Sequence, residues 1–352
     1  MAQKSKPNKA VIVLWLITGL LFVCFSPKVT QASGLNFDVE VVTPENQIDK
    51  QQTYFDLLVK PNQSQELLIK ITSLSDKEIV IDANPNIATT NQNGEVSYSE
   101  IPGVLDSTLT YPVTSMLSKK QRVRLAPKEM KEIIFQLKIP KKAFDGKVVG
   151  GFLFQEVMET SENFSSKGIN IDNYFALVKG IQLQESFKKI KQNIEIKKIT
   201  ATALNYKRAI TVNLQNTESD FIRELAAEVK VKRKGSSDVL YERKQRGISM
   251  APNSHFDFPI FMDNQELKSG DFLMEITLTG KDFNKSRTKP FTISKELAEE
   301  INGKAVDLVG GKASQSIVMK LVLSVCILLI PLTIIIGKWF VRKNGKKTIS
   351  RK

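Results

Sequence analysis

The side chains that usually carry out catalysis are scarce in this sequence. It contains one histidine, His255, and two cysteines, Cys24 and Cys326, which lie in apolar stretches near the two ends. Because His255 alternates out of phase with Phe256 and Phe258, we expect its side chain to face solvent. A catalytic base also needs a nucleophile and an orienting acid, and neither stands near His255 in the sequence. The sequence therefore favours a binding protein over an enzyme.

The sequence also lacks the usual residues and motifs that bind metal ions or phosphate groups. A single histidine cannot form a histidine zinc cluster, and the region between the two cysteines has no thiolate to offer. The sequence has no glycine-rich phosphate loop, nucleophile elbow or metalloprotease helix motif. We therefore expect no metal, no cofactor and no catalytic residue. A pair of carboxylates brought together by folding stays open, since the chain has 37 acidic residues.

Two short segments hold the residues that we predict to bind a ligand. Around a tight Asn-Gly turn, Asn91, Asn93 and Tyr98 offer amide groups and one aromatic ring to a sugar. In the apolar stretch KVVGGFLF, Gly150 and Gly151 predict a bulge or a close approach of another backbone. The alternatives are an ordinary hairpin tip for the first segment and a central core strand for the second.

The elements that must position these residues follow an alternating pattern of apolar and polar side chains, which is typical of half-buried strands. The pattern is clearest over residues 37–41, 67–71, 133–139, 210–214, 256–260 and 272–278. Turns that begin with proline precede three of these stretches, and Asn93-Gly94 and Asp145-Gly146 predict further tight turns. Short strands separated by such turns indicate β-sandwiches. We predict an all-β fold of two tandem immunoglobulin-like β-sandwich domains.

The two ends of the chain carry membrane signals. Residues 317–337 form an apolar run that is long enough, as a transmembrane helix, to cross a membrane, and the tail 338–352 is basic. The positive-inside rule places such a tail in the cytoplasm. At the other end, lysines, an apolar stretch and small residues predict a secretory signal peptide over 1–32, with an uncleaved anchor as the alternative. We therefore expect a single-pass protein of the cell membrane with its ectodomain outside.

These terminal segments also explain most of the net charge of +14. Residues 1–32 and 317–352 hold twelve of the 51 Lys and Arg residues and none of the 37 acidic ones. The region between them is therefore nearly neutral, at about +2. Binding to nucleic acid needs a basic face on a folded domain, so we expect no nucleic-acid partner.

A polar stretch marks the boundary between the two predicted domains. The polar stretch 159–170 fits a linker, and a division there gives domains over 36–160 and 161–305. The strand predicted over 174–183 can close the first sandwich or open the second. After the last strand, Ser294 predicts the N-cap of a short helix.

Several motifs together resemble the WxL-interacting proteins. KPNQSQELLIKITS, ATTNQNGEVSYS and FDGKVVGGFLFQE are similar to parts of the first domain of that family. MAPNSHFDFPI, LKSGDFLMEITLTG and FTISKELAEEING are similar to parts of the second. The apolar span and the basic tail complete the same layout. Two departures are small, since Asn62 stands where Gly is frequent and Asp271-Phe272 where Gly-Tyr is common.

The resemblance implies a membrane-anchored surface protein of low-GC Gram-positive bacteria. It implies that 36–160 binds peptidoglycan, that 161–305 binds the host or its extracellular matrix, and that WxL-domain surface proteins are partners. The function we expect is a non-enzymatic adaptor in adhesion at the cell surface. The alternatives are a peptidoglycan-modifying wall enzyme and a chaperone that captures secreted surface proteins by pairing with their strands.

Overall fold

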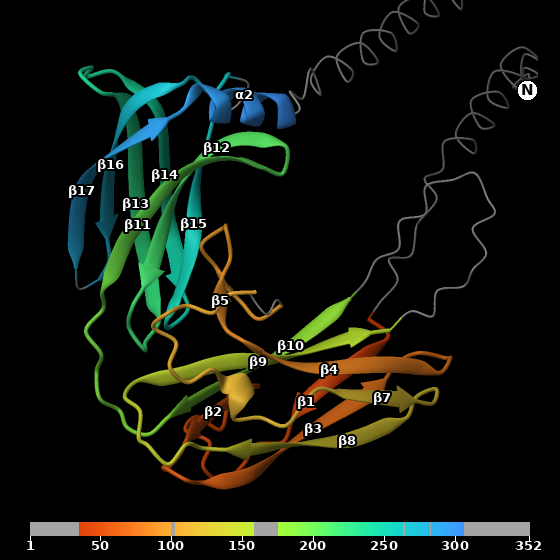
Figure 1. Ribbon diagram of the computed structural model, residues 1–352. Coiled ribbons are helices and arrows are strands. Elements are labelled where there is room, and N and C mark those ends of the chain that lie inside the picture. Colours follow the sequence, from red (N-terminus) through yellow and green to blue (C-terminus); the bar gives the residue numbers. More distant parts are fainter. Residues whose placement is uncertain (1–34, 100–102, 158–174, 263–264, 282, 306–352) are drawn as a thin grey trace, which may run out of the picture.

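Strands make up most of the part of the chain that a computed structural model describes, which is residues 35–99, 103–157, 175–262, 265–281 and 283–305. They form two pairs of packed sheets, and each pair encloses a hydrophobic core of its own (Figure 1). We call the pair nearer the N-terminus the first sandwich and the other the second sandwich. The predicted all-β sandwich fold is thereby confirmed.

The predicted terminal segments are outside this description. The signal peptide over 1–32, the span over 317–337 and the tail over 338–352 all lie beyond the described residues. Within the described ranges, no helix combines the length and apolar character needed to cross a membrane. The short helix expected after the last strand is present as α2 (Lys295–Lys304), and the Ser294 side chain caps it by accepting a backbone hydrogen bond.

The first sandwich packs a three-stranded sheet, in the order β1-β3-β8, against a five-stranded sheet, in the order β2-β10-β9-β4-β7. Alternation turns one face of each sheet inward, and the rings of Phe135 and Phe152 meet in the core with centroids 4.6 Å apart. A small hairpin of β5 and β6 and a 3₁₀ turn, η1, lie outside these sheets. The elements are β1 (Phe37–Val41), β2 (Phe55–Leu58), β3 (Ser64–Ser73), β4 (Ile79–Ile87), β5 (Thr89–Thr90), β6 (Val96–Ser97), η1 (Val113–Ser115), β7 (Gln121–Leu125), β8 (Met130–Lys138), β9 (Lys147–Glu156) and β10 (Ala176–Gln184).

Strand β9 contains the paired glycines and lies in the middle of the five-stranded sheet. Its register with β4 and with β10 runs without a shift through Gly150 and Gly151, so there is no bulge. The close approach that the glycines predicted is present. A Cβ atom on Gly150 would lie 2.3 Å from the Asn86 carbonyl oxygen and 2.3 Å from Val113 Cγ1. Gly150 therefore lets η1 pack directly against the centre of the sheet and leaves room for a carbonyl of the neighbouring strand β4.

Strand β10 corresponds to the strand predicted over 174–183, which the sequence could not assign to the first or the second sandwich. It pairs antiparallel with β9 along its whole length and parallel with β2 over its second half. The first sandwich therefore extends to Gln184, past the boundary that we predicted at residue 160. Alternation could not decide this, because it shows which face of a strand is buried and not which strand lies beside it.

The second sandwich packs a sheet in the order β11-β12-β15 against one in the order β14-β13-β16-β17. Helix α2 contributes Ala298 and Ile301 to the same core, which also contains Phe258 and Phe272. The strands are β11 (Ile194–Leu204), β12 (Lys207–Asn216), β13 (Ile222–Arg233), β14 (Val239–Met250), β15 (Ser254–Phe261), β16 (Gly270–Thr279) and β17 (Asn284–Ile293).

The three turns that begin with proline lead into β3, β8 and β15. In each, the residue after the proline has a positive φ, as the third residue of a type II turn does. The angles are 63° at Asn62, 58° at Lys128 and 47° at Asn253. Asn is the residue that tolerates this region best after Gly, so Asn62 fits a position where Gly is frequent.

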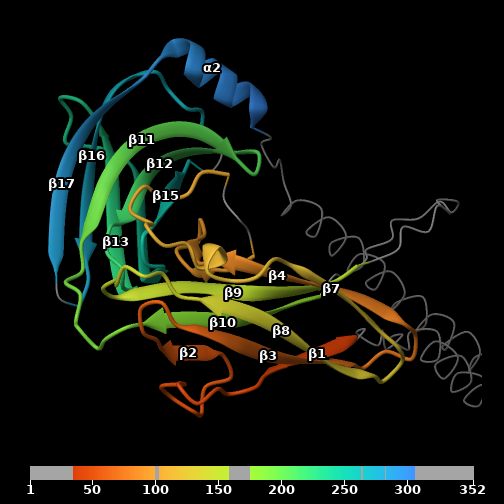
Figure 2. The ribbon, with the colours of Figure 1, turned by 60° about the horizontal axis from the view of Figure 1, so that its bottom comes forward.

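The two sandwiches together have the shape of an L. In both views, the strands of the second sandwich run roughly across those of the first (Figures 1 and 2). The β5–β6 hairpin projects from the first sandwich toward the second, where β5 contacts β14 and β15. The inner corner of the L is therefore built from both sandwiches.

Candidate functional site

A small apolar cluster joins the two sandwiches. Ala88 and Val149 of the first sandwich pack against Phe221 and Ala251 of the second, and all four are buried. The cluster is separate from both large cores and far smaller than either. We call this contact region between the two sandwiches the joint. Because the cluster is small, apolar burial alone does not fix the angle between the sandwiches, and polar contacts surround the cluster.

Two glycines of predicted tight turns lie in this joint. Gly94 and Gly146 have φ angles of 73° and 80°, which is the local reason for glycine. A second reason is contact with the other sandwich, since a Cβ on Gly94 would lie 2.9 Å from Ile248 Cγ2. A Cβ on Gly146 would lie 2.3 Å from the carbonyl oxygen of Ser219, which accepts a hydrogen bond from the Lys147 N–H. Both turns are thus shaped to meet the second sandwich.

Hydroxyl groups add a buried contact across the joint. Thr90 Oγ1 and Ser254 Oγ are 2.7 Å apart, and Thr90 Oγ1 also accepts a hydrogen bond from the Ala251 N–H. Ser254 Oγ donates in turn to the Ala251 carbonyl at 2.8 Å. These groups are satisfied by one another, as buried polar groups must be. They hold β5 against the start of β15.

One charged residue is buried at the joint. Asp106, on the loop before η1, places Oδ2 2.6 Å from His255 Nδ1 on β15. Its Oδ1 accepts hydrogen bonds from the Thr108 N–H, the Thr108 hydroxyl and Gln215 Nε2. The Asp106 side chain is 4% exposed, whereas that of His255 is 42% exposed. The first sandwich therefore inserts a carboxylate into a polar socket of the second.

The pKa of Asp106 follows from these contacts. Burial acts to raise the pKa, but the hydrogen bonds from Thr108, His255 and Gln215 together outweigh it and hold the pKa below its ordinary value. An ionised carboxylate accepts the proton on Nδ1 of His255, which leaves Nε2 as the nitrogen available to other groups. Asp106 thus orients the ring.

Sequence reasoning missed this pair. The prediction that His255 lies out of phase with Phe256 and Phe258 is correct, because both phenylalanines are buried. The orienting acid was not found because Asp106 stands 149 residues earlier in the chain. Among the described residues, no hydroxyl or thiol bonds to the His255 ring, so the pair lacks the nucleophile of a hydrolytic triad.

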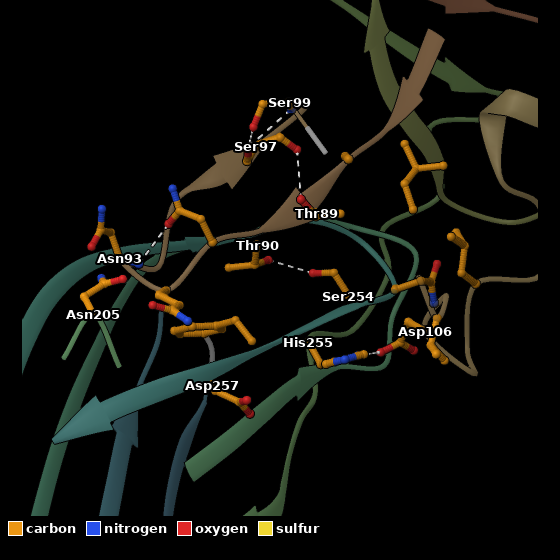
Figure 3. A pocket seen from close by; sticks show the side chains of 18 residues that line it. Thr89, Thr90, Asn93, Ser97, Ser99, Asp106, Asn205, Ser254, His255 and Asp257 are labelled. Atoms are coloured by element: carbon orange, nitrogen blue, oxygen red, sulfur yellow. Dashed lines mark hydrogen bonds and ion pairs between the residues drawn. The ribbon is translucent and has the colours of Figure 1, made fainter. Parts of the chain in front are cut away.

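The Asp106–His255 pair borders a cleft of about 590 Å³ between the sandwiches (Figure 3). The β5–β6 hairpin, the turn between β11 and β12, and β15 form its walls. Among the described lining residues, five carry hydroxyl groups and five carry carboxamides, and the carboxamides belong to Asn91, Gln92, Asn93, Asn205 and Asn253. Of the described residues that line the cleft, none is a lysine or an arginine.

Two of the five predicted ligand-binding residues line this cleft. The Asn91 side-chain oxygen accepts hydrogen bonds from two backbone N–H groups of its own loop, so it shapes the loop. The Asn93 amide has no partner among the described residues and is free to bind. Tyr98, Gly150 and Gly151 do not line the cleft. The Tyr98 ring instead covers Gly151, where a Cβ would lie 3.1 Å from the ring. That any of the five binds a ligand stays a prediction.

Comparison with known family models defines the class of protein. A model described as the WxL Interacting Protein peptidoglycan binding domain matches residues 37–156, and one described as the host binding domain of the same proteins matches 166–303. Both describe binding domains, and neither describes an enzyme. The chain belongs to the WxL-interacting protein family, as its sequence motifs indicated.

Comparison with solved structures finds fimbrial chaperones. A chaperone–tip adhesin complex described as vital for synergistic activation of CFA/I fimbriae biogenesis has a TM-score of 0.30 and 16% identity, and the match covers 73% of this chain and 98% of the other. The E. coli chaperone DraB has a TM-score of 0.26 and 11% identity, with coverage of 73% and 98%. These TM-scores are too low for the arrangement of the sandwiches to be compared. None of the curated proteins with which the chain was compared matches it.

Proposed function

We propose that this protein is a membrane-anchored adaptor on the surface of a Gram-positive bacterium. The first sandwich binds peptidoglycan, the second binds a host or matrix ligand, and secreted WxL-domain proteins join the assembly. The observation that carries the proposal is the match of two binding-domain models to two sandwiches with separate cores. We treat the sandwiches as two domains on the same ground.

The joint supports an adaptor because it fixes the direction of one binding surface relative to the other. Asp106 and the Thr90 hydroxyl are buried contacts between the sandwiches, and replacing either leaves an unpaired polar group. Opening the joint would break these hydrogen bonds between buried polar groups, so the joint is not a freely moving hinge. An adaptor that spans the distance from membrane to wall benefits from such a fixed angle.

Membrane anchoring in this proposal rests on the sequence of residues 317–352. Protease treatment of intact protoplasts is expected to digest the protein except for a small C-terminal fragment. The same treatment after lysis should remove that tail as well. A large protected fragment in intact protoplasts would contradict the proposed topology.

Wall binding is tested by cosedimentation of the full chain with purified insoluble peptidoglycan. The ectodomain has a net charge of only about +2, so attraction to anionic polymers should contribute little. We expect retention to persist at ~0.5 M salt, where charges are screened within less than ~8 Å. Insoluble cellulose serves as the control for trapping in the pellet. Release by salt, or equal retention on cellulose, would contradict peptidoglycan binding.

Partner binding is tested separately from wall binding. The tagged protein, solubilised from native membranes, is expected to retain secreted proteins that carry a WxL domain. Incubation with muropeptides is expected to give no new products, since an adaptor binds the wall without cleaving it. New muropeptides would instead favour the wall-enzyme alternative.

A further inference from the structure

Unused polar groups from both sandwiches face the cleft. The amides of Gln92 and Asn93 in the β5–β6 hairpin, and of Asn205 in the turn between β11 and β12, make no hydrogen bond to any described residue. The same holds for Nε2 of His255. Asp257, two residues further along β15, uses one oxygen to accept a hydrogen bond from an amide on the neighbouring strand. These side chains are exposed, so their remaining donors and acceptors are available to a ligand.

The available groups surround the cleft instead of lying on one wall. Figure 3 shows Asn93 and Asn205 at one side and the Asp106–His255 pair at the opposite side. Asn93 belongs to the first sandwich and Asn205 to the second. A ligand that reached from the amides to the imidazole would therefore contact both sandwiches at once.

The chemistry of the lining selects the class of ligand. A carboxamide both donates and accepts hydrogen bonds, which matches a sugar hydroxyl that does the same. An anion finds no Lys or Arg among the described lining residues and meets two carboxylates, Asp106 and Asp257. A metal ion is disfavoured as well, since no group of three or more potential ligand residues occurs in the described part of the chain.

The size and the apolar parts of the cleft fit the same class. Its volume of about 590 Å³ lies within the ~300–1,000 Å³ typical of pockets for small ligands. Leu109 contributes apolar surface among the polar groups, and Val104, which is 79% exposed, adds an apolar rim. Sugar rings carry C–H faces that pack on such surface while their hydroxyls bond to amides.

We propose that the cleft between the two sandwiches is a binding site for a neutral oligosaccharide, built jointly by Asn93 of the first sandwich and Asn205 and His255 of the second. The inference rests on the proposed wall-binding function and names its site. It adds contacts from the second sandwich to the glycan binding proposed for the first. Because the joint is already fixed by buried contacts, the site is pre-organised and loses little freedom on binding.

The single histidine gives a direct reading from this cleft. The full chain is purified with a tag that lacks histidine, in a detergent without a sugar head group, and its histidine is labelled with ¹³C. A neutral chitooligosaccharide is then titrated in, and the imidazole signals of His255 are followed by NMR. We expect these signals to shift and saturate. A polyanionic teichoic acid at the same sugar concentration should leave them unchanged.

Variants test whether both sandwiches contribute. Asn93→Ala removes one amide, and Asn205→Gly removes the other while keeping a residue that tolerates its φ of 49°. Each should weaken binding roughly three- to tenfold, as expected for one lost hydrogen bond. Gln51→Ala and Gln265→Ala remove an exposed amide from each sandwich away from the cleft and should have no effect.

The outcomes separate this proposal from the proposed function. If the wild type binds the oligosaccharide and both cleft variants bind as tightly as the controls, the site lies elsewhere while wall binding stands. If only one variant weakens binding, the site belongs to one sandwich and the joint site is wrong. If the wild type sediments with peptidoglycan but binds no neutral oligosaccharide, the cleft site is wrong and the proposed wall binding stands. If the wild type binds neither peptidoglycan nor the oligosaccharide, the cleft site and the proposed wall binding are both wrong.

Discussion

The two sandwiches protect their open edges by partly different means. In the first, other parts of the main chain cover two of the edge strands, β8 and β2, and one lysine side chain, that of Lys131 on β8, donates to the Arg124 carbonyl on β7. The outer side of β8 is covered by the segment before β7, through the Ser118 N–H to the Gln136 carbonyl and the Lys138 N–H to the Met116 carbonyl. The outer side of β2 is covered by the preceding loop, where the Leu58 N–H donates to the Asn46 carbonyl.

The second sandwich uses long side chains for the same purpose. Lys285 Nζ on β17 donates to the Ile194 carbonyl at the start of β11, and Lys289 Nζ donates to the carbonyls of Ile196 and Lys197 at 2.9 and 2.7 Å. The register of β11 with β12 shifts between Ile196 and Ile199, and β11 has no strand on its other side in the order of its sheet. Two lysines thus bridge the gap between the two sheets.

Each sandwich is therefore vulnerable to a different kind of change. A main-chain cover withstands most substitutions, because the backbone groups are the same in every residue. A side-chain cover depends on particular lysines, and its loss uncovers a strand edge that can pair with another molecule. We therefore expect the second sandwich to be the more sensitive one at its edge, and the two to be alike in their cores.

The largest expected effect tests whether the two cores are independent. Phe256 is 4% exposed in the second core, and Phe256→Asp removes a buried aromatic side chain, which costs ~3–5 kcal/mol, and adds a buried carboxylate. Hydrogen exchange measured strand by strand should show loss of protection in β11–β17 and retained protection in β3, β8 and β9. Loss throughout the chain would show that the cores unfold as one unit.

His255→Ala is the matched control for that change. Its side chain points away from the second core, so the core should remain folded. It removes one partner of the buried Asp106 carboxylate, so we expect a cost of ~1–3 kcal/mol that is confined to the joint. Equal losses of protection for the two variants would contradict the assignment of Phe256 to the core face of β15 and His255 to the opposite face.

An intermediate effect is expected at the centre of the first sandwich. Gly150→Ala places a Cβ 2.3 Å from a backbone carbonyl, and such overpacking costs ~1–3 kcal/mol. Gly151→Ala meets the Tyr98 ring at 3.1 Å, and a ring at the surface of the sheet can shift. The midpoint of chemical denaturation should therefore fall more for Gly150→Ala. A larger fall in the midpoint for Gly151→Ala would mean that η1 can move away from the added Cβ more easily than the Tyr98 ring can.

A smaller effect is expected from the lysine bridge. Replacing Lys285 and Lys289 by Met removes charged hydrogen bonds whose acceptors then turn to water, at a cost of ~1 kcal/mol. Light scattering should also show more self-association, because the β11 edge is uncovered. Lys268→Met, an exposed lysine outside the bridge, is the control. Unchanged stability and association would show that the bridge does not protect the edge.

The smallest effect under ordinary conditions concerns acid. The pKa of Asp106 is lower in the folded protein than its ordinary value of 3.8, so its contribution to stability is complete above 3.8 and is lost as pH falls through the lowered value. His255, Thr108 and Gln215 are the groups that face it. Energy transfer between labels on the two sandwiches should change below about pH 4. Asp106→Asn should abolish that change, and a change that persists in Asp106→Asn would point to another group.

Strands and turns were predictable because their signals are local. Alternation at Phe37 and Val39 needs only one buried face, and a positive φ after proline needs only the turn itself. The joint was not predictable, since Thr90 and Ser254 lie 164 residues apart and nothing near either residue marks the other. For the same reason Asn93 was proposed as a ligand residue from its turn, whereas Asn205 and His255, which complete the cleft, were not.

Strand β10 has a consequence for how this gene can be divided and recombined. It is the sheet neighbour of β2, and β2 has no other neighbour in the order of its sheet. A gene fragment that stops at residue 160 would encode a first sandwich without one of its own strands, although the host-binding family match already begins at 166. Exchange of whole sandwiches between relatives is therefore expected to succeed for crossovers at residues 185–193, between β10 and β11. A crossover upstream of β10 gives the first sandwich a strand inherited from a different parent.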